Sequence, residues 1–187
     1  MGLKKTKAIK HHGKRVSEIL EAHASFFAGK EQGVRADLSG ANLAGADLHS
    51  ANLAGAILRG ANLEGADLRK ARLSSADLCG ANLRKADLRN ADLTEASLVG
   101  ANLEQAQASG IEFFRCDLAN ANFQQALLRN TNFRLANVQG AKFRGADMGV
   151  AILRETDLSG ADLSGVDLST TLMPRDYAPA GGESKSA

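Results

Sequence analysis

The amino-acid sequence predicts an all-β fold, a parallel solenoid in which short strands stack coil upon coil. Residues 36–175 divide into 28 consecutive five-residue units without a change of phase. One position of the unit is nearly always Leu, and the position two residues earlier is nearly always Ala. Gly is common in the last position, where the chain has to turn. A period of five fits neither the helical period of about 3.6 nor the strand period of about 2, so it indicates a repeat architecture.

Each position of the unit, Ala-(Asp/Asn)-Leu-x-x, has its own expected direction. Leu fills 20 of the 28 central positions, and Ala fills 22 of the 28 positions two residues earlier. Residues two apart in an extended chain point to the same side, so the Ala and Leu positions both point inward. The polar residue between them faces water, and the last two residues turn the chain. Because Lys70, Lys85 and Glu95 occupy the last position, a positive φ is not expected to be obligatory there.

Four units are expected to close one coil of twenty residues, giving about seven coils. At a strand spacing of ~4.8 Å, seven coils would make a rod about 34 Å long. Stacked coils bury a continuous core that no single coil could bury, so the array is counted as one domain. Residues twenty apart then stack in ladders, and the short Asp and Asn side chains of these ladders are expected to bond nearby turn amides. The ladders are Asn42, Asn62, Asn82, Asn102 and Asn122 on one side, and Asp47, Asp67 and Asp87 on the next.

The repeat carries a family resemblance. Runs such as residues 41–48, Ala-Asn-Leu-Ala-Gly-Ala-Asp-Leu, resemble the pentapeptide-repeat proteins, and the resemblance covers 140 of 187 residues. It implies a right-handed quadrilateral parallel β-helix. The segment from Ile19 to Phe27, followed by Arg35-Ala36-Asp37-Leu38, also resembles the lead-in segment of many bacterial members.

A short helix is expected before the coils, because apolar residues recur at helical spacing and Gly29 and Gly33 then offer stop signals. These residues are Val16, Ile19, Leu20, His23 and Phe27. A solenoid needs its open end covered. The sequence therefore predicts a basic flexible leader over 1–14, a capping helix over 15–33, the β-helix over 34–175 and a disordered tail over 176–187. His23 could be a ligand or base, but a hydrogen-bonded residue at the helix–coil junction is favoured.

The C-terminal end of the solenoid has no comparable cover in the sequence. Two prolines and the run Gly181-Gly182-Glu183-Ser184 are typical of a disordered tail, and no amphipathic helix follows the last coil. The end is open unless Leu172, Met173 and Tyr177 fold over it or a second copy does. An end-to-end homodimer is therefore one expectation.

No catalytic, cofactor or metal site is expected. The four histidines are scattered, and the chain lacks a Gly-rich phosphate loop and a metal-ligand spacing. Cys79 falls in an outward position and Cys116 in an inward one, so no disulfide is expected between them. The chain has no apolar run long enough to span a bilayer and no apolar segment of a secretory signal, which favours the cytoplasm.

The distribution of charge along the chain distinguishes between possible classes of binding partner. The coils from Arg35 to Arg175 hold 15 basic and 16 acidic residues, so they are nearly neutral. The resemblance implies an alternative function, because the best-known family members protect DNA gyrase by mimicking DNA. A duplex mimic should present dense negative charge, which argues against this alternative. The basic leader could bind nucleic acid or an anionic membrane, but it lacks aromatic residues for base stacking and is interpreted as a solvated tail. Nucleic acid is not an expected partner.

One region departs from the repeat. Ala108 is a small residue in a central position, and Ile111 is a large residue in an Ala position, a swap that can conserve volume. Beyond it, apolar residues occupy outward positions beside arginines, which is typical of a protein-binding surface. The alternative is surface drift without consequence. The candidate patch is Phe114, Arg115, Leu127, Arg129, Arg134, Leu135, Val150, Ile152 and Arg154. The sequence thus favours a non-enzymatic, rigid protein–protein interaction scaffold of a bacterial cytoplasm with an unidentified partner, and gyrase modulation is the alternative.

Overall fold

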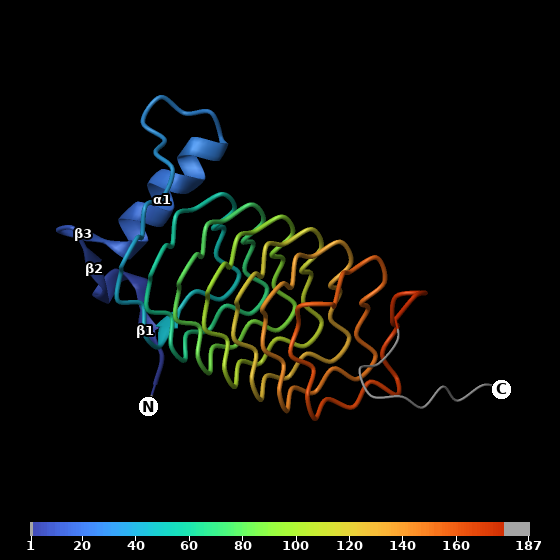
Figure 1. Cartoon of the computed structure of the whole chain (residues 1–187). Helices are drawn as coiled ribbons and strands as arrows, with labels where there is room; N and C mark the ends of the chain where they lie inside the picture. The colour runs from blue at the N-terminus through green and yellow to red at the C-terminus, as the bar shows by residue number, and fades with distance from the viewer. Residues whose placement is uncertain (1, 178–187) are drawn as a thin grey trace.

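The computed structural model describes residues 2–177, which form a rod of stacked coils closed at one end by an N-terminal cap (Figure 1). Most of the predicted tail, residues 178–187, lies outside the described residues. Regular elements are few and short because each side of a coil contributes a single bridged residue. They are β1 (Lys4–Lys5), the 3-10 helix η1 (Thr6–Ala8), β2 (Lys10–His11), β3 (Lys14–Arg15), α1 (Val16–Phe27) and β4 (Ala46–Asp47).

The coils repeat every twenty residues. Parallel bridges join residues twenty apart along the rod, as in the series Asn42, Asn62 and Asn82. Each bridge is held by two backbone bonds: Leu43 N–H donates to the C=O of Asn62 at 2.7 Å, and Asn62 N–H donates to the C=O of Ala41 at 2.9 Å. The pairing confirms the twenty-residue coil and the two polar ladders that the sequence predicts.

The Ala and Leu positions form the core. Leu83 and Ala81 are fully buried, like nearly all residues in the same positions of the middle coils. Four phenylalanines replace leucine in the C-terminal half, and their neighbouring ring centroids lie 5.0–6.1 Å apart in stacked and edge-to-face pairs. These distances are those of favourable aromatic packing. The four phenylalanines are Phe113, Phe123, Phe133 and Phe143.

The last position of the unit adopts a left-handed backbone in nearly every coil, with Gly160, Thr170 and Arg175 as exceptions, so a positive φ is not obligatory there, but Lys70, Lys85 and Glu95, from which this was predicted, all have one. Lys70 has a φ of 58°, Lys85 57° and Glu95 59°, values close to the 64° of Gly40. A residue with a Cβ pays about 1–2 kcal/mol for this conformation. The turn geometry is set by the stacking of the coils, and the ladder bonds on both sides offset the local cost.

Residues 2–15 differ from the flexible leader that the sequence predicts. β1 pairs in parallel with β4, so it adds a strand to the edge of the first coil. Lys10–His11 and Lys14–Arg15 form an antiparallel hairpin, and Val16 N–H donates to the C=O of Ile9 at 2.8 Å. The charged side chains of this segment favoured a solvated, flexible leader. In the structure these side chains stay exposed to water, and the backbone of the segment forms β-pairs. The exposed first edge of the solenoid supplies that pairing.

The cap helix α1 lies within the predicted segment 15–33 and projects obliquely from the rod (Figure 1). Its first turn is closed by Arg15 N–H donating to the Glu18 carboxylate at 3.0 Å. The chain then returns along the helix, where Val34 N–H bonds the C=O of Ala22 at 3.1 Å. Gly33 permits this return, because a Cβ there would lie 2.3 Å from the Phe26 backbone. Within residues 2–177, no helix is long and apolar enough to cross a membrane.

Candidate protein-binding surface

Exposed apolar side chains gather on the C-terminal half of the rod. Within the coils, the large hydrophobic residues with the highest exposure all lie between positions 127 and 172, with exposed fractions of 40–46 %. Patches of exposed apolar residues rimmed by polar ones mark interaction surfaces. The four residues are Leu127, Leu135, Val150 and Leu172.

The structure brings one group of three together on the last two coils. Ile152 and Leu172 form a parallel bridge, with Leu172 N–H donating to the C=O of Ala151 at 2.8 Å. Val150 lies two residues before Ile152, at the corner of the same coil. The sequence analysis named Leu172 as a residue that could cover the C-terminal end and left it out of the candidate patch, although adding the coil length of twenty to Ile152 would have placed it there. We call Val150, Ile152 and Leu172 the apolar corner.

A second group surrounds Phe114, which is half-buried. The Arg115 guanidinium carbon lies 5.1 Å from the centroid of the Phe114 ring, a cation–π contact. Arg115 N–H donates to the C=O of Arg134 at 3.1 Å, which places Arg134 and the following Leu135 directly over this pair. Phe114 and Leu135 are therefore neighbours on adjacent coils.

Leu127 does not join either group. It pairs with Gln107 on one side and with Asp147 on the other, on an adjoining side of the coil. Its ladder is otherwise polar, so Leu127 is a single exposed leucine. Of the predicted patch, the structure unites two apolar groups and leaves this residue apart.

The arginines of the predicted patch are engaged with carboxylates of neighbouring coils. Arg129 pairs with Asp147 at 3.2 Å, Arg134 with Glu155 at 2.9 Å and Arg115 with Glu95 at 3.7 Å. Arg154 is exposed. These exposed pairs contribute little to stability. These ion pairs affect recognition instead, because the border of the patch presents alternating positive and negative charges and not a free basic surface.

Two residues of these groups occupy the left-handed turn position. Leu135 has a φ of 58° and Val150 a φ of 59°, although each side chain is exposed. This conformation is least suited to a β-branched residue such as Val150. Packing against the rod does not compensate for the strain, since nearly half of the side chain faces water. The same conformation recurs at nearly all last positions of the repeat, so the fold itself imposes it on Leu135 and Val150.

The acidic ladder on another side of the rod is neutralised by basic side chains. Asp67 pairs with Arg69 at 2.7 Å, and Asp87 pairs with Arg89 at 2.6 Å. The hydrogen bond from Arg69 holds the pKa of Asp67 below its usual range. At the capped end, Lys5 bonds to Asp47. The charges that a DNA mimic would need to expose are thus interleaved with cations.

The thiols offer little chemistry. Cys116 is buried, its Sγ bonds the C=O of Leu93 at 2.7 Å, and burial raises the pKa of its thiol to about 12. Cys79 is half-exposed, with its Sγ 3.1 Å from Oγ of Ser97. Both are free, as the sequence predicts. Across the described chain, no three His, Cys, Asp or Glu side chains are arranged to hold a metal ion.

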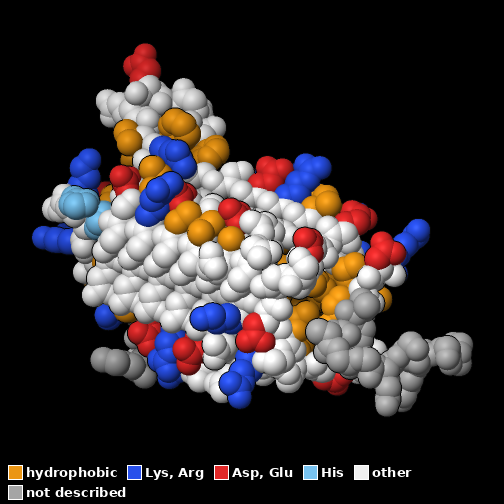
Figure 2. All heavy atoms as spheres, in the orientation of Figure 1, with side chains coloured by type: hydrophobic (Ala, Val, Ile, Leu, Met, Phe, Trp, Pro, Cys, Tyr) orange, Lys and Arg blue, Asp and Glu red, His pale blue; other side chains and the backbone are white. Residues whose placement is uncertain are grey.

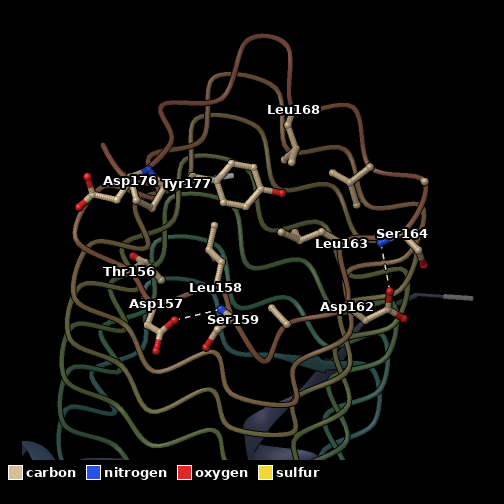
Figure 3. A pocket seen from close by; sticks show the side chains of 14 residues that line it. Thr156, Asp157, Leu158, Ser159, Asp162, Leu163, Ser164, Leu168, Asp176 and Tyr177 are labelled. Atoms are coloured by element: carbon tan, nitrogen blue, oxygen red, sulfur yellow. Dashed lines mark hydrogen bonds between the residues drawn. The ribbon is translucent and has the colours of Figure 1, made fainter. Parts of the chain in front are cut away.

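The C-terminal end of the rod is hollow. An open cavity of about 890 Å³ lies over the last coil and is lined by Leu158, Leu163, Leu168 and Tyr177 among others. Figure 3 shows the three leucines and the Tyr177 ring around this opening, with Asp157 and Asp162 at its edge. Tyr177 partly covers the core, in line with the sequence, whereas Leu172 points to solvent at 40 % exposure.

Comparison with known proteins identifies the repeat. The family model described as pentapeptide repeats matches residues 34–69, 71–107, 111–149 and 136–169, with eight copies. A search of the curated proteins gives no match to this sequence.

Solved structures with detectable similarity include two from cyanobacteria. Rfr23, a pentapeptide repeat protein from Cyanothece 51142, is 33% identical over 49% of this chain and 63% of its own, with a TM-score of 0.47. This chain thus spans less than two thirds of Rfr23. HetL, involved in heterocyst differentiation regulation in Nostoc sp. strain PCC 7120, is 28% identical over 75% of this chain and 78% of its own, with a TM-score of 0.44. QnrB1, a plasmid-mediated fluoroquinolone resistance protein, is 20% identical over 76% and 91%, with a TM-score of 0.49.

Proposed function

We propose that this chain, which belongs to the pentapeptide-repeat family, is a non-enzymatic scaffold of the cytoplasm that binds a protein partner on the C-terminal half of its rod. The observation that carries the proposal is the apolar corner, in which Val150 and Leu172 are exposed and Ile152 between them is half-buried. Family membership also leads us to propose the right-handed winding expected for the coils.

The chemistry of this candidate surface indicates the kind of protein partner that fits it. Three of the four arginines beside the apolar groups, Arg115, Arg129 and Arg134, are paired with carboxylates, so a strongly acidic partner gains little from these three. An apolar anchor surrounded by balanced polar groups fits a partner that inserts one or two aliphatic or aromatic side chains. Phe114 and Leu135 extend this surface around the next corner of the rod.

The flat, ladder-like sides of the rod support a scaffold over an enzyme. Its interior is filled by leucine and phenylalanine side chains, so a substrate has no interior pocket along the coils. The thiol of Cys116 is buried and protonated at neutral pH, which removes the most reactive nucleophile type from that position.

Affinity capture with matched variants tests the proposal. V150N/I152N replaces the two apolar residues with the Asn that fills the same positions one coil earlier, at Asn130 and Asn132, so the fold should be kept. I57N removes an outward Ile from the same unit position on a different side of the rod and serves as the control. Wild type and I57N should capture the same proteins from the native cell, and V150N/I152N should lose at least one of them. Identical captures with all three proteins would contradict the proposal.

A separate variant tests the second apolar group. F114A/R134A removes the ring and the arginine over it, and partner capture should be lost while the circular dichroism spectrum is unchanged. If F114A/R134A captures the same proteins as wild type, the binding surface does not extend to Phe114.

A further inference from the structure

The two ends of the rod differ in shape and charge. At the capped end, residues 2–15 contain six basic residues and no acidic one. The hairpin of β2 and β3 lies at the outermost part of this end, opposite the last coil (Figure 1). In Figure 2, Lys, Arg and His side chains project from the capped end, where hydrophobic and acidic side chains are also seen, and a cluster of hydrophobic side chains lies at the other end.

The hairpin is a basic projection. Lys10 pairs with Arg15 and His11 with Lys14 across its two strands, and Lys10, Lys14 and Arg15 are exposed. His12 and Gly13 form the turn with φ values of 47° and 79°. In the described chain no carboxylate forms an ion pair with the side chains of these three cations, although Lys5 nearby pairs with Asp47.

The opposite end is an acidic hollow. Its lining contains three carboxylates, Asp157, Asp162 and Asp176, and no Lys or Arg among the described residues. Hydrogen bonds from Ser159 lower the pKa of Asp157, and those from Ser164 lower the pKa of Asp162. Both carboxylates are therefore charged at neutral pH.

The last coil also leaves apolar surface and backbone groups uncovered. Leu158 is 8 % exposed and Leu163 and Leu168 are half-buried, whereas central leucines of the middle coils are fully buried. The last coil bridges the preceding one at Asp162 and Leu172, and the corresponding bridges to Asp157 and Asp167 are absent from the described residues. An exposed sheet edge over an open core invites association.

We propose that copies of this chain associate head to tail, with the basic hairpin of one copy seated in the acidic hollow of the next. The two surfaces are complementary in charge, which steers and selects partners. A tail-to-tail pair would instead place the three carboxylates of one hollow against the same three of another. Because the two surfaces differ, the contact is heterologous and extends to an open chain unless its rotation closes a ring.

Sedimentation velocity of the full chain tests this association. The weight-average mass of the wild type should rise beyond that of two copies with protein concentration, and high salt should lower it by screening the charges. K10E/K14E should abolish the rise. D157K/D162K should abolish it as well, and Lys142 shows that the position below Asp162 already accepts a lysine. D157N/D162N keeps the acceptor for the serine amides and should weaken association without disturbing the coil.

Mixing the variants makes the test specific. K10E/K14E supplies an intact acidic hollow and D157K/D162K an intact basic hairpin, so an equal mixture should restore complexes that neither variant forms alone. The control K70E/K85E reverses two exposed lysines on the sides of the rod, in positions where Glu95 shows that Glu is tolerated, and should associate like wild type. Circular dichroism melting checks that each variant is folded.

Two outcomes would overturn the proposal. Association that survives K10E/K14E but is lost in D157K/D162K would mean that two C-terminal ends meet. A single-copy mass at every concentration would mean that the basic hairpin does not bind the acidic hollow.

Discussion

Ala36 donates its backbone N–H to Nδ1 of His23 at 3.0 Å, and this bond joins α1 to the first unit of the solenoid. His23 is fully buried and its ring packs edge-on against Phe27 at 5.1 Å. Since Nδ1 accepts, the hydrogen of the neutral ring sits on Nε2. The favoured interpretation of His23 as a hydrogen-bonded residue at the helix–coil junction is confirmed.

The His23 bond predicts a pH-dependent loss of stability. Burial lowers the pKa of His23, the C=O of Ala54 counters part of this, and the charge of Arg35 lowers it further. The unfolded chain takes up the proton near pH 6.5, where the folded chain still resists it. Stability is thus fully present above about pH 6.5 and falls as the pH drops below it. Denaturant unfolding at a series of pH values above about 5 measures the loss before the carboxylates titrate.

Two substitutions isolate the contribution of His23. H23N keeps an acceptor for Ala36 N–H but does not titrate, so its unfolding free energy should depend less on pH than that of wild type. H23L leaves the buried amide without an acceptor and should cost about 1–3 kcal/mol at neutral pH. His11 also has a pKa lowered by burial, so an unchanged pH dependence in H23N would assign the effect to His11 instead.

Leu83 tests the inward assignment of the central positions. Its side chain is fully buried in the middle of the stack, so L83D places an unpaired charge in the core. Loss of about 3–5 kcal/mol is expected, a large share of the stability of a typical domain. N82D changes the neighbouring outward residue, which is Asp in many other units, and should cost less than about 1 kcal/mol. Thermal unfolding followed by circular dichroism distinguishes them, and similar melting curves would refute the assignment.

The size swap at Ala108 and Ile111 predicts strong coupling. Both are fully buried, and Glu112 N–H reaches the C=O of Ala91 only at 3.4 Å, longer than the 2.9 Å usual in this ladder. I111A alone should cost about 2–4 kcal/mol by leaving a cavity, and A108L alone about 1–3 kcal/mol by overpacking. The double variant restores the common unit and should cost less than the sum. Denaturant unfolding of the four proteins gives the coupling energy, and additive costs would show that the two changes are independent.

Gyrase is not expected to respond to this protein. Asp47, Asp67 and Asp87 are each paired with a basic side chain, so the ladder lacks the continuous negative charge of a duplex. A supercoiling assay with and without the protein, at equal salt, should give the same rate. Inhibition, or protection from a quinolone, would instead support the DNA-mimic alternative.

The outward residues show how far sequence reasoning reached toward the candidate surface. Phe114 and Leu135 lie on adjacent coils, as a fixed phase requires, because it places residues of successive coils over one another. Leu127 was placed in the same patch, yet it lies apart between Gln107 and Asp147. The pairing of Arg134 with Glu155 was also missed, since the rotamers of long side chains are decided by their neighbours in space and not by the repeat.

The sequence alone determined the repeating coil, its buried Ala and Leu positions, its polar ladders and a capping helix within 15–33, which the structure bounds at Val16–Phe27. These follow from periodicity, which is local information copied 28 times. Only the tertiary structure decided the pairing of β1 with β4, the left-handed turns at residues such as Lys70 and Val150, and the opening of the last coil. Each of these features depends on the residues of the neighbouring coil or, at an end of the stack, on the absence of a neighbouring coil. The ends and corners of the rod therefore hold the information that the repeat cannot supply.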